Sequence, residues 1–346
     1  MSKLRVVFVG LDNPHASGWR ATIPIHAEME PVAVVAAKPE ETQSLQGEYK
    51  SLPVHYSVAE LIDKTEFDAA VVTRSNADAP AACIELANAG KHILAEKTTA
   101  RSAAEFQTIA DAVAANGVQW TTGYTWRFSP EAQDIRGMVQ QGAFGDVWAW
   151  EARYWTSTVK SRNPQHYLFS KEVSGGGMFS WLGCHSMDLM LYLVGQPVAS
   201  VTAKVGNVAG EAIDVEDGGV AIFRFANGAI GSLRAGYFLA DGGNQLDYGL
   251  LGSQGWAQWS PMDATVRYCS LADDLKAAPH RTVNYERAKV PGYSNQMGQD
   301  LLSDWLHAIR TNGTTLNNTQ TALAIHKLLD AIYESSASGK EVALAG

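Results

Sequence analysis

The stretch FDAAVVTRSNADAPAACIELANAGKHILAEK, residues 67–97, decides the fold of this chain. It begins with an apolar run over residues 67–73, continues with a helical pattern over 80–89 and ends with a second apolar run over 92–95. Gly90 stands where a glycine commonly ends a helix. Two apolar strands joined by a helix indicate parallel strands in a sheet that helices cover on both faces.

The same alternation continues on both sides of this stretch. Its further strands and helices are predicted at residues 5–10, 14–27, 32–37, 103–115 and 118–122. The series predicts an α/β domain over residues 1–122, with a Rossmann-like, doubly wound parallel sheet. Ligands bind such sheets at the C-terminal ends of the strands, and the ends that carry polar residues here are 10–15, 73–76 and 96–97.

The first of these ends departs from the dinucleotide-binding pattern G-x-G-x-x-G. Residues 10–15 are Gly-Leu-Asp-Asn-Pro-His, so Gly10 is the one glycine of the pattern that remains. We expect Asn13 to cap the next helix and Pro14 to be its first residue. His15 would then lie in the first turn, where it can donate to a phosphate, whereas the carboxylate of Asp12 would repel one.

The end of the second strand carries Lys38 and no acidic residue directly beside it. An acid there commonly binds the ribose of NAD, while a cation suits the 2′-phosphate of NADP. Lys38 therefore gives NADP a small preference over NAD, although a solvated loop lysine explains it equally well. The residues predicted to contact a dinucleotide are Gly10, Leu11, Asp12, Asn13, His15, Lys38, Thr73, Arg74, Ser75, Asn76, Glu96 and Lys97.

Composition limits the classes of function. The chain has 346 residues, of which 46% are hydrophobic, and a formal net charge of −9, which argues against nucleic acid as a partner. Three widely spaced cysteines form no disulfide framework or metal-binding pattern, and we expect no metal site. We find no apolar run of the roughly 18 residues that a membrane span needs and no signal peptide, so we expect a cytoplasmic protein.

From residue 123 onward the pattern changes to longer strands with period-two alternation. Strands are predicted at residues 147–155, 199–208, 219–225, 229–238, 246–252 and 255–259, and helices at 299–311 and 319–336. The apolar segment GGGMFSWLGCHSMDLMLYLVG, residues 175–195, predicts a buried helix with Trp181, His185 and Asp188 on one face. We therefore predict an α+β domain over residues 123–346, with an open and mostly antiparallel sheet.

His185 and Lys97 are the candidate proton-handling residues. A buried histidine on an apolar helix is either a hydrogen-bonded core residue or an acid–base group that lines a cleft. Lys97 follows a buried strand and thus reaches the ligand edge of the first sheet. The residues predicted to contact a substrate are Tyr124, Arg127, His166, Trp181 and Asp188.

Three segments together resemble the glucose–fructose oxidoreductase/inositol dehydrogenase family, known as Gfo/Idh/MocA. They are AGKHILAEKTTA at residues 89–100, WRFSPEAQDIRGMVQQGAFGDVW at 126–148 and the helix segment at 175–195. The resemblance implies an NAD(P)-dependent oxidoreductase that acts on a sugar, cyclitol or related polyol derivative. It also implies a homodimer or homotetramer that packs through the sheet of the C-terminal domain.

The resemblance assigns roles to single residues. Lys97 matches the family's lysine that helps to activate the substrate hydroxyl, and His185 matches its catalytic histidine. Gly10, Thr73 and Glu96 match positions that line the dinucleotide. Asp188 matches an aspartate that we expect to be mainly structural.

Two departures from the family pattern bear on the chemistry. Trp181 stands where a carboxylate normally precedes the histidine by four residues, and Thr98 replaces the proline of the EKP motif. Proton transfer would then run through His185 and Lys97 alone, or use Tyr124 or Asp188. Two alternatives follow: a cofactor-poor sugar-binding sensor or structural protein on the same fold, and a glycoside hydrolase or lyase in which the cofactor oxidises the sugar only transiently.

Overall fold

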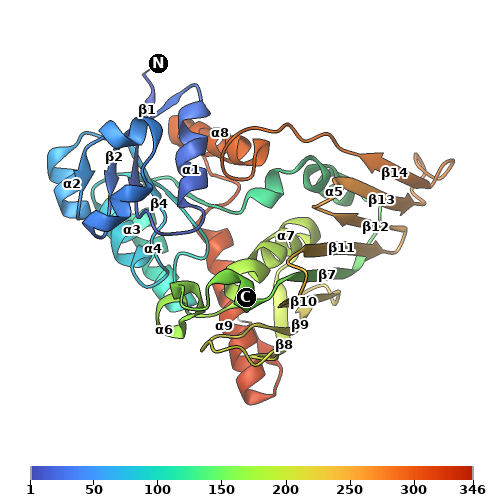
Figure 1. The fold of residues 1–346 in the computed structure, drawn as a ribbon. Coiled ribbons are helices and arrows are strands. Elements are labelled where there is room, and N and C mark those ends of the chain that lie inside the picture. Colours follow the sequence, from blue (N-terminus) through green and yellow to red (C-terminus); the bar gives the residue numbers. More distant parts are fainter. Residues whose placement is uncertain (1, 345–346) are drawn as a thin grey trace. The chain divides into compact units, whose positions relative to one another are not determined.

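The computed structural model describes residues 2–344, which form two compact units (Figure 1). Within the described residues, the first unit combines residues 2–125 with Ala288–His326, and the second combines Trp126–Arg287 with residues 327–344. The predicted domain boundary lies close to the first crossing at Thr125. The return of residues 288–326 to the first unit, however, is absent from the predicted division.

The sheet of the first unit is parallel and, within the described residues, has six strands in the order β3-β2-β1-β4-β5-β6. The strands are β1 (Leu4–Val9), β2 (Met29–Val35), β3 (Val54–His55), β4 (Ala69–Val72), β5 (His92–Ala95) and β6 (Trp120–Thr122). The predicted doubly wound sheet is therefore confirmed. The short strand β3 was not predicted, since it contributes only two residues.

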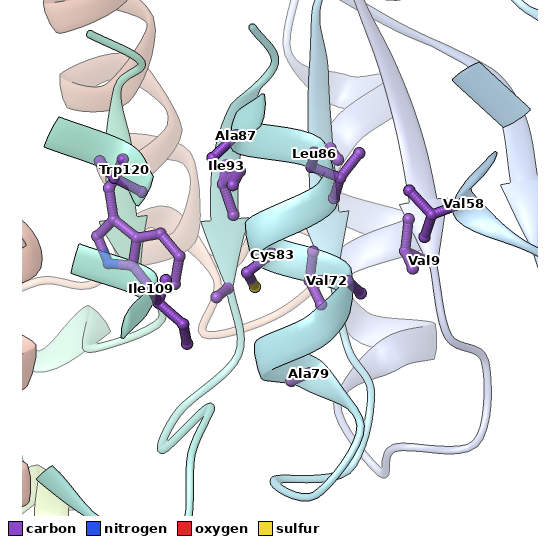
Figure 2. Packing of buried hydrophobic residues seen from close by; sticks show 14 of the residues in the cluster. Val9, Val58, Val72, Ala79, Cys83, Leu86, Ala87, Ile93, Ile109 and Trp120 are labelled. Atoms are coloured by element: carbon purple, nitrogen blue, oxygen red, sulfur yellow. The ribbon is translucent and has the colours of Figure 1, made fainter. Parts of the chain in front are cut away.

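Helices cover this sheet and supply its core. They are α1 (Ala16–Thr22), α2 (Val58–Lys64), α3 (Ala79–Asn88), α4 (Ala103–Asn116) and α8 (Gln296–Thr311), with short 3₁₀ helices at Ile23–Ile25, Pro39–Ser44 and Gly47–Ser51. A further 3₁₀ helix, Thr125–Phe128, lies where the chain passes into the second unit. Figure 2 shows Cys83 and Leu86 of α3 beside Val72 of β4 and Ile93 of β5, all of them buried. This packing fixes the strand ends that carry the candidate site.

The start of α1 differs from the prediction. The helix begins at Ala16, whereas Asn13 and Pro14 were expected to be its cap and first residue. The side chain of Asn13 instead accepts a hydrogen bond from the backbone N–H of His15 at 2.8 Å, which closes a separate turn before the helix. His15 takes the cap position as a result.

The sheet of the second unit has, among the described residues, nine strands in the order β14-β13-β12-β11-β7-β10-β9-β8-β15. The strands are β7 (Val147–Ser157), β8 (Val198–Gly206), β9 (Gly218–Phe225), β10 (Ile230–Leu239), β11 (Asn244–Gly252), β12 (Gly255–Ser260), β13 (Thr265–Ser270), β14 (His280–Asn284) and β15 (Val342–Ala343). β7 and β10 pair in parallel and the other neighbours are antiparallel, which confirms a mostly antiparallel sheet. β13 and β14 were not predicted. In β14 the reason is that the strand is polar and largely exposed.

The helices of this unit lie against one face of the sheet. They are α5 (Pro130–Gln140), α6 (Lys171–Ser174), α7 (Cys184–Val194) and the last part of α9 (Thr319–Ser338), with 3₁₀ helices at Val159–Arg162 and Tyr167–Phe169. The predicted buried helix is interrupted: Phe179–Gly183 forms a π-helical turn that leads into α7. α7 packs on β7 and β10, so its candidate residues face the interior of the unit.

Candidate functional site

The ends of β1, β4 and β5 lie side by side in the first sheet and bring Gly10, Thr73 and Glu96 to one edge. The hydroxyl of Thr73 donates to the carbonyl of Gly10 at 2.7 Å. Gly10 has a φ of +98°, and a Cβ there would lie 2.9 Å from the carbonyl oxygen of Thr73. The first position of the dinucleotide pattern thus has the close backbone approach that requires glycine.

Glu96 is the buried acid of this edge, with 3% of its surface exposed. Its carboxylate contacts Nδ1 of His15 at 2.9 Å and accepts a hydrogen bond from Nε1 of Trp19 at 2.7 Å. Burial alone would raise the pKa of Glu96, but His15, Lys97 and Trp19 together hold it below its usual value. His15, predicted as a phosphate donor, therefore directs one ring nitrogen to a carboxylate of the protein.

Lys97 is also buried, with 1% exposure, and the turn that carries it is held on several sides. The side chain of Asn76 donates to the hydroxyl of Thr98 at 3.0 Å, and Thr99 donates to the carbonyl of Glu96 at 2.7 Å. Nε2 of His326 in α9 donates to the carbonyl of Thr98 at 2.8 Å. The Lys97–Thr98 peptide bond is cis although Thr98 replaces a proline.

The end of β2 contains an acid that the sequence analysis did not find. The 3₁₀ helix Pro39–Ser44 turns back, and the carboxylate of Glu41 accepts a hydrogen bond from the backbone N–H of Ala37 at 2.9 Å. Lys38 at the same end is exposed. Pro39 was the sequence signal for this turn, because proline is common at the first position of a helix.

The other residues predicted to contact a dinucleotide differ in exposure. Leu11, Asn13 and Ser75 are buried, Asp12 is exposed, and Arg74 and Asn76 are half-buried. The hydroxyl of Ser75 donates to Asp78 at 2.7 Å. The exposure of Asp12 is consistent with a carboxylate that is turned away from a phosphate.

In the second unit, His185 is buried at 5% exposure and lies in an aromatic cradle. Its ring stacks on Trp126, with the ring centres 4.8 Å apart and the planes 26° from parallel. The ring centres of Tyr154 and Tyr248 lie 6.0 and 6.2 Å from the ring centre of Trp126. The hydroxyl groups of Tyr248 and Ser186 are 2.9 Å apart. The stacking contact with Trp126 fixes the orientation of the imidazole ring, as a proton carrier requires.

Arg127 and Asp188, both predicted to contact substrate, contact each other. Nε of Arg127 donates to both carboxylate oxygens of Asp188 at 3.0 and 2.9 Å, and Nη2 lies 2.7 Å from Oδ1. Burial raises the pKa of Asp188, and the charge of Arg127 opposes that rise. The pair holds the 126–128 segment against α7.

The remaining predicted substrate residues lie in different places. Trp181 is buried in the π-helical turn, at 8% exposure, and His166 is half-buried in the loop after β7. Tyr124 is buried in the first unit, where its carbonyl accepts a hydrogen bond from Asn317 at 2.8 Å.

Glu216 is a buried residue beside the segment that leads into α7, and the sequence analysis missed it. Its carboxylate accepts hydrogen bonds from the N–H groups of Gly177 and Phe179 at 2.8 and 2.9 Å and from the hydroxyl of Tyr333 at 3.0 Å. It therefore caps the segment that leads into His185. A Cβ on Gly177 would lie 2.0 Å from the backbone oxygen of Glu216, so the glycine triplet permits this contact.

Residues 2–344 contain neither a candidate metal site nor a candidate membrane span. We find no group of three or more His, Cys, Asp or Glu side chains placed to hold a metal ion there. No helix in that range combines the length and the apolar character that a bilayer crossing requires.

Comparison with known proteins identifies the family. Residues 4–124 match the family model described as an oxidoreductase family with an NAD-binding Rossmann fold, and residues 132–258 match the model of the GFO/IDH/MocA C-terminal domain. The chain belongs to the Gfo/Idh/MocA family. The two matches cover most of the chain and both of its units.

Individual members of the Gfo/Idh/MocA family are only distantly similar. The levoglucosan dehydrogenase of Pseudarthrobacter phenanthrenivorans is 28% identical over 196 residues, which are 50% of either chain. The myo-inositol 2-dehydrogenase of Thermotoga maritima is 27% identical over 176 residues, again 50% of either chain. This chain thus aligns with about half the length of such curated relatives.

Solved structures extend the similarity to the whole fold. A levoglucosan dehydrogenase in complex with NADH superposes with a TM-score of 0.87 at 21% sequence identity, covering 99% of this chain and 100% of that one. At this identity the likeness establishes the Gfo/Idh/MocA fold and no more.

Proposed function

We propose that this protein transfers a hydride between NAD(P) and a sugar, cyclitol or related polyol derivative. The burial of Lys97 is the observation that carries the proposal: this lysine follows β5 at the ligand edge of a Rossmann-type sheet, in a chain of the Gfo/Idh/MocA family. A cation kept from solvent at that edge suits a reaction in which a hydroxyl develops negative charge.

The first unit has features that fit a dinucleotide. Gly10 leaves space for a close approach at the end of β1, and Thr73 and Glu96 line the same edge. A bound nicotinamide would accept or supply the hydride, which needs correct placement more than any protein group. We assign this binding role to the first unit and substrate binding to the second.

Lys97 and His185 handle the proton in this proposal. In the oxidative direction, His185 accepts the hydroxyl proton, and Lys97 stabilises the negative charge that develops on the oxygen as the proton leaves; loss of the hydride then forms the carbonyl. The stack of His185 on Trp126 keeps the ring in one orientation for this step. In the reductive direction His185 returns the proton to the carbonyl oxygen.

The choice between NAD and NADP depends on the end of β2. The exposed Lys38 favours the 2′-phosphate of NADP, whereas the carboxylate of Glu41 favours the free ribose hydroxyl of NAD. Because Glu41 is fixed to Ala37 and Lys38 extends into solvent, we infer that NAD binds more tightly. Glu41→Gln would then weaken NADH binding and strengthen NADPH binding.

The outer face of the second sheet suits a second copy of this chain. Val220, Ile222, Ile230 and Leu251 are 37%, 50%, 56% and 41% exposed on that face. Exposed apolar side chains gathered on one sheet commonly mark a protein interface. We propose a homodimer or homotetramer that assembles there, in the cytoplasm, where the three buried thiols would stay reduced.

Titration of the purified protein with NADH and NADPH, followed by nicotinamide fluorescence, tests the proposal first. Binding supports both the dehydrogenase and the transiently oxidising hydrolase or lyase. No binding of either cofactor at near-millimolar concentration would leave the sugar-binding sensor as the remaining function. Stoichiometric formation of NADH with a polyol then distinguishes the dehydrogenase from the hydrolase.

Lys97→Ala and His185→Ala test the assigned roles. Positioned acid–base groups typically contribute 10²–10⁴-fold, so we expect each variant to lose at least ~100-fold in kcat. Cofactor binding by His185→Ala should persist, because His185 lies in the second unit. Activity within a few-fold of the wild type in both variants would refute the roles.

A further inference from the structure

Arg162 lies on the helix-covered face of the second sheet. It ends the 3₁₀ helix Val159–Arg162, in the loop that follows β7. Nη2 donates to the hydroxyl of Thr156 at 2.6 Å, Nε donates to the carbonyl of Ser157 at 3.2 Å, and the guanidinium lies over the ring of Tyr237 at 5.1 Å. Thr156 and Tyr237 are both buried, so these contacts draw the cation into the interior face.

Arg162 has no acidic partner among residues 2–344. Its two hydrogen bonds go to neutral oxygens, and the ring below it belongs to a tyrosine. Burial raises the pKa of Tyr154 and of Tyr237, so both of these neighbours are neutral at physiological pH. The negative charge of Glu216 also raises the pKa of Tyr237. The carboxylate of Glu216, however, already accepts hydrogen bonds from Gly177, Phe179 and Tyr333.

The guanidinium of Arg162 and the imidazole of His185 both lie on the helix-covered face of the second sheet. Tyr154 and Thr156 are successive residues on the interior face of β7, which places them about 7 Å apart. The hydroxyl of Thr156 accepts the hydrogen bond from Arg162. The ring centre of Tyr154 lies 6.0 Å from that of Trp126, and the Trp126 ring in turn stacks on His185, with the ring centres 4.8 Å apart. A positive charge therefore lies on the same interior face as the proposed acid–base group and is linked to it through Thr156, Tyr154 and Trp126.

Trp181 places an uncharged indole four residues before His185. At this position the family pattern has a carboxylate, and here an indole occupies the π-helical turn one step before α7. An interior face with an arginine that has no ion-pair partner, and with an indole in place of that carboxylate, complements a negatively charged ligand better than a neutral one. Guanidinium groups bind carboxylates through two parallel hydrogen bonds, which also fix orientation.

We propose that the substrate is a sugar acid, an aldonate or uronate whose carboxylate binds Arg162 while a ring or chain hydroxyl faces His185. This inference rests on the proposed function and adds the class of substrate. In the reaction a secondary alcohol is oxidised to a ketone, its hydride reduces NAD⁺ to NADH, and its proton passes to His185. The carboxylate stays unchanged and serves as the handle for binding.

Matched pairs of sugars test this assignment. Gluconate with glucitol, and galacturonate with galactose, differ mainly in the carboxylate, and reduction of NAD⁺ is followed by absorbance. We expect the wild type to have a kcat/KM for the acid that exceeds that of its neutral partner by about tenfold or more, since hydrogen bonds to charged groups contribute that much. Arg162→Gln should abolish this difference through KM with a smaller effect on kcat, and Arg162→Lys should restore part of it.

Lys160→Gln is the control, because it removes one positive charge from the same loop at a side chain that is 82% exposed. It should keep the wild-type preference for acids. Preference for the neutral sugars, or an unchanged acid-to-neutral ratio in a folded Arg162→Gln protein, would overturn the inference. Failure of every acid to react or to bind the NADH complex would also overturn it. Lack of NADH binding would instead count against the proposed function.

Discussion

Arg127 and Asp188 neutralise each other inside the second unit, at 7% and 1% side-chain exposure. Removal of one member of a buried ion pair leaves the other charge without compensation, which typically costs about 3–5 kcal/mol. We therefore expect Asp188→Ala to lower the free energy of unfolding by roughly that amount. Urea denaturation followed by tryptophan fluorescence measures the change.

Asp273→Asn provides the comparison. The Lys276–Asp273 ion pair is 61% and 96% exposed, so its loss should change stability by less than about 1 kcal/mol. If Asp188→Ala kept the wild-type stability and raised only the KM for substrate, Asp188 would be a substrate ligand and not a structural residue.

His326 makes the stability of the first unit depend on pH. Burial lowers its pKa to about 4 from 6.5, although the hydrogen bond to Thr98 opposes that shift. The unfolded chain therefore takes up a proton near pH 6.5 and the folded chain only near pH 4. The folded state loses stability as the pH falls through this window, by on the order of 2 kcal/mol at a pH of about 5.

His326→Gln keeps an N–H donor for the carbonyl of Thr98 but does not titrate. We expect its unfolding free energy to fall less than that of the wild type between pH 7 and pH 5, by about 2 kcal/mol. The exposed His307→Gln is the matched control. Identical pH profiles for His326→Gln and the wild type would show that His326 does not carry this dependence.

Single residues were predictable from the sequence where local pattern determines their position. Lys97 follows a buried strand, so its delivery to the sheet edge was evident, and His185 lies on an apolar helix. The contacts of Arg127 with Asp188 and of His15 with Glu96 were not evident, because they join residues 61 and 81 positions apart. Only the tertiary structure brings such partners together.

At the scale of elements, the segment before α7 is held by a close backbone contact. A Cβ on Gly177 would lie 2.0 Å from the backbone oxygen of Glu216, so Gly177→Ala must displace one of the two segments. We expect a loss of stability of about 1–3 kcal/mol together with a fall in activity, since His185 follows on the same helix. Thermal unfolding and steady-state kinetics measure the two effects.

Gly137→Ala is the matched control in α5. A Cβ there has no atom within 4 Å, and alanine favours a helix over glycine, so the variant should be more stable by about 0.5–1 kcal/mol. Equal effects of the two substitutions would mean that the contact with Glu216 yields without cost.

The elements themselves were largely predictable, with physical reasons for the exceptions. Apolar strands between helices gave clear signals for β1, β2, β4, β5 and β6, and the strands of the hairpin β9–β10, which turns at Asn227 and Gly228, were also predicted. The π-helical turn at Phe179–Gly183 was not predictable, because one extra residue in a turn leaves the apolar pattern almost unchanged. β14 was not predicted because buried and exposed positions do not alternate along it.

At the scale of the whole molecule, the outer face of the second sheet is the surface to test. Ile222→Glu places a charge among exposed apolar side chains. We expect this variant to sediment as a monomer under conditions in which the wild type sediments as an oligomer. Ile25→Glu, at a 44% exposed position of the first unit, should leave the assembly intact. A wild-type protein that sediments as a monomer would contradict assembly through this face.

The return of residues 288–326 to the first unit affects the order in which the protein can fold during synthesis. α8 docks through Gln299, which donates to the carbonyl of Thr22, and Thr315 and Asn317 bind the carbonyls of Trp120 and Thr122 at β6. The ribosome delivers these residues after the whole middle of the chain. Although domains usually fold from the N-terminus onward, the nascent first unit must wait for its final segment, so its binding edge is completed late in translation.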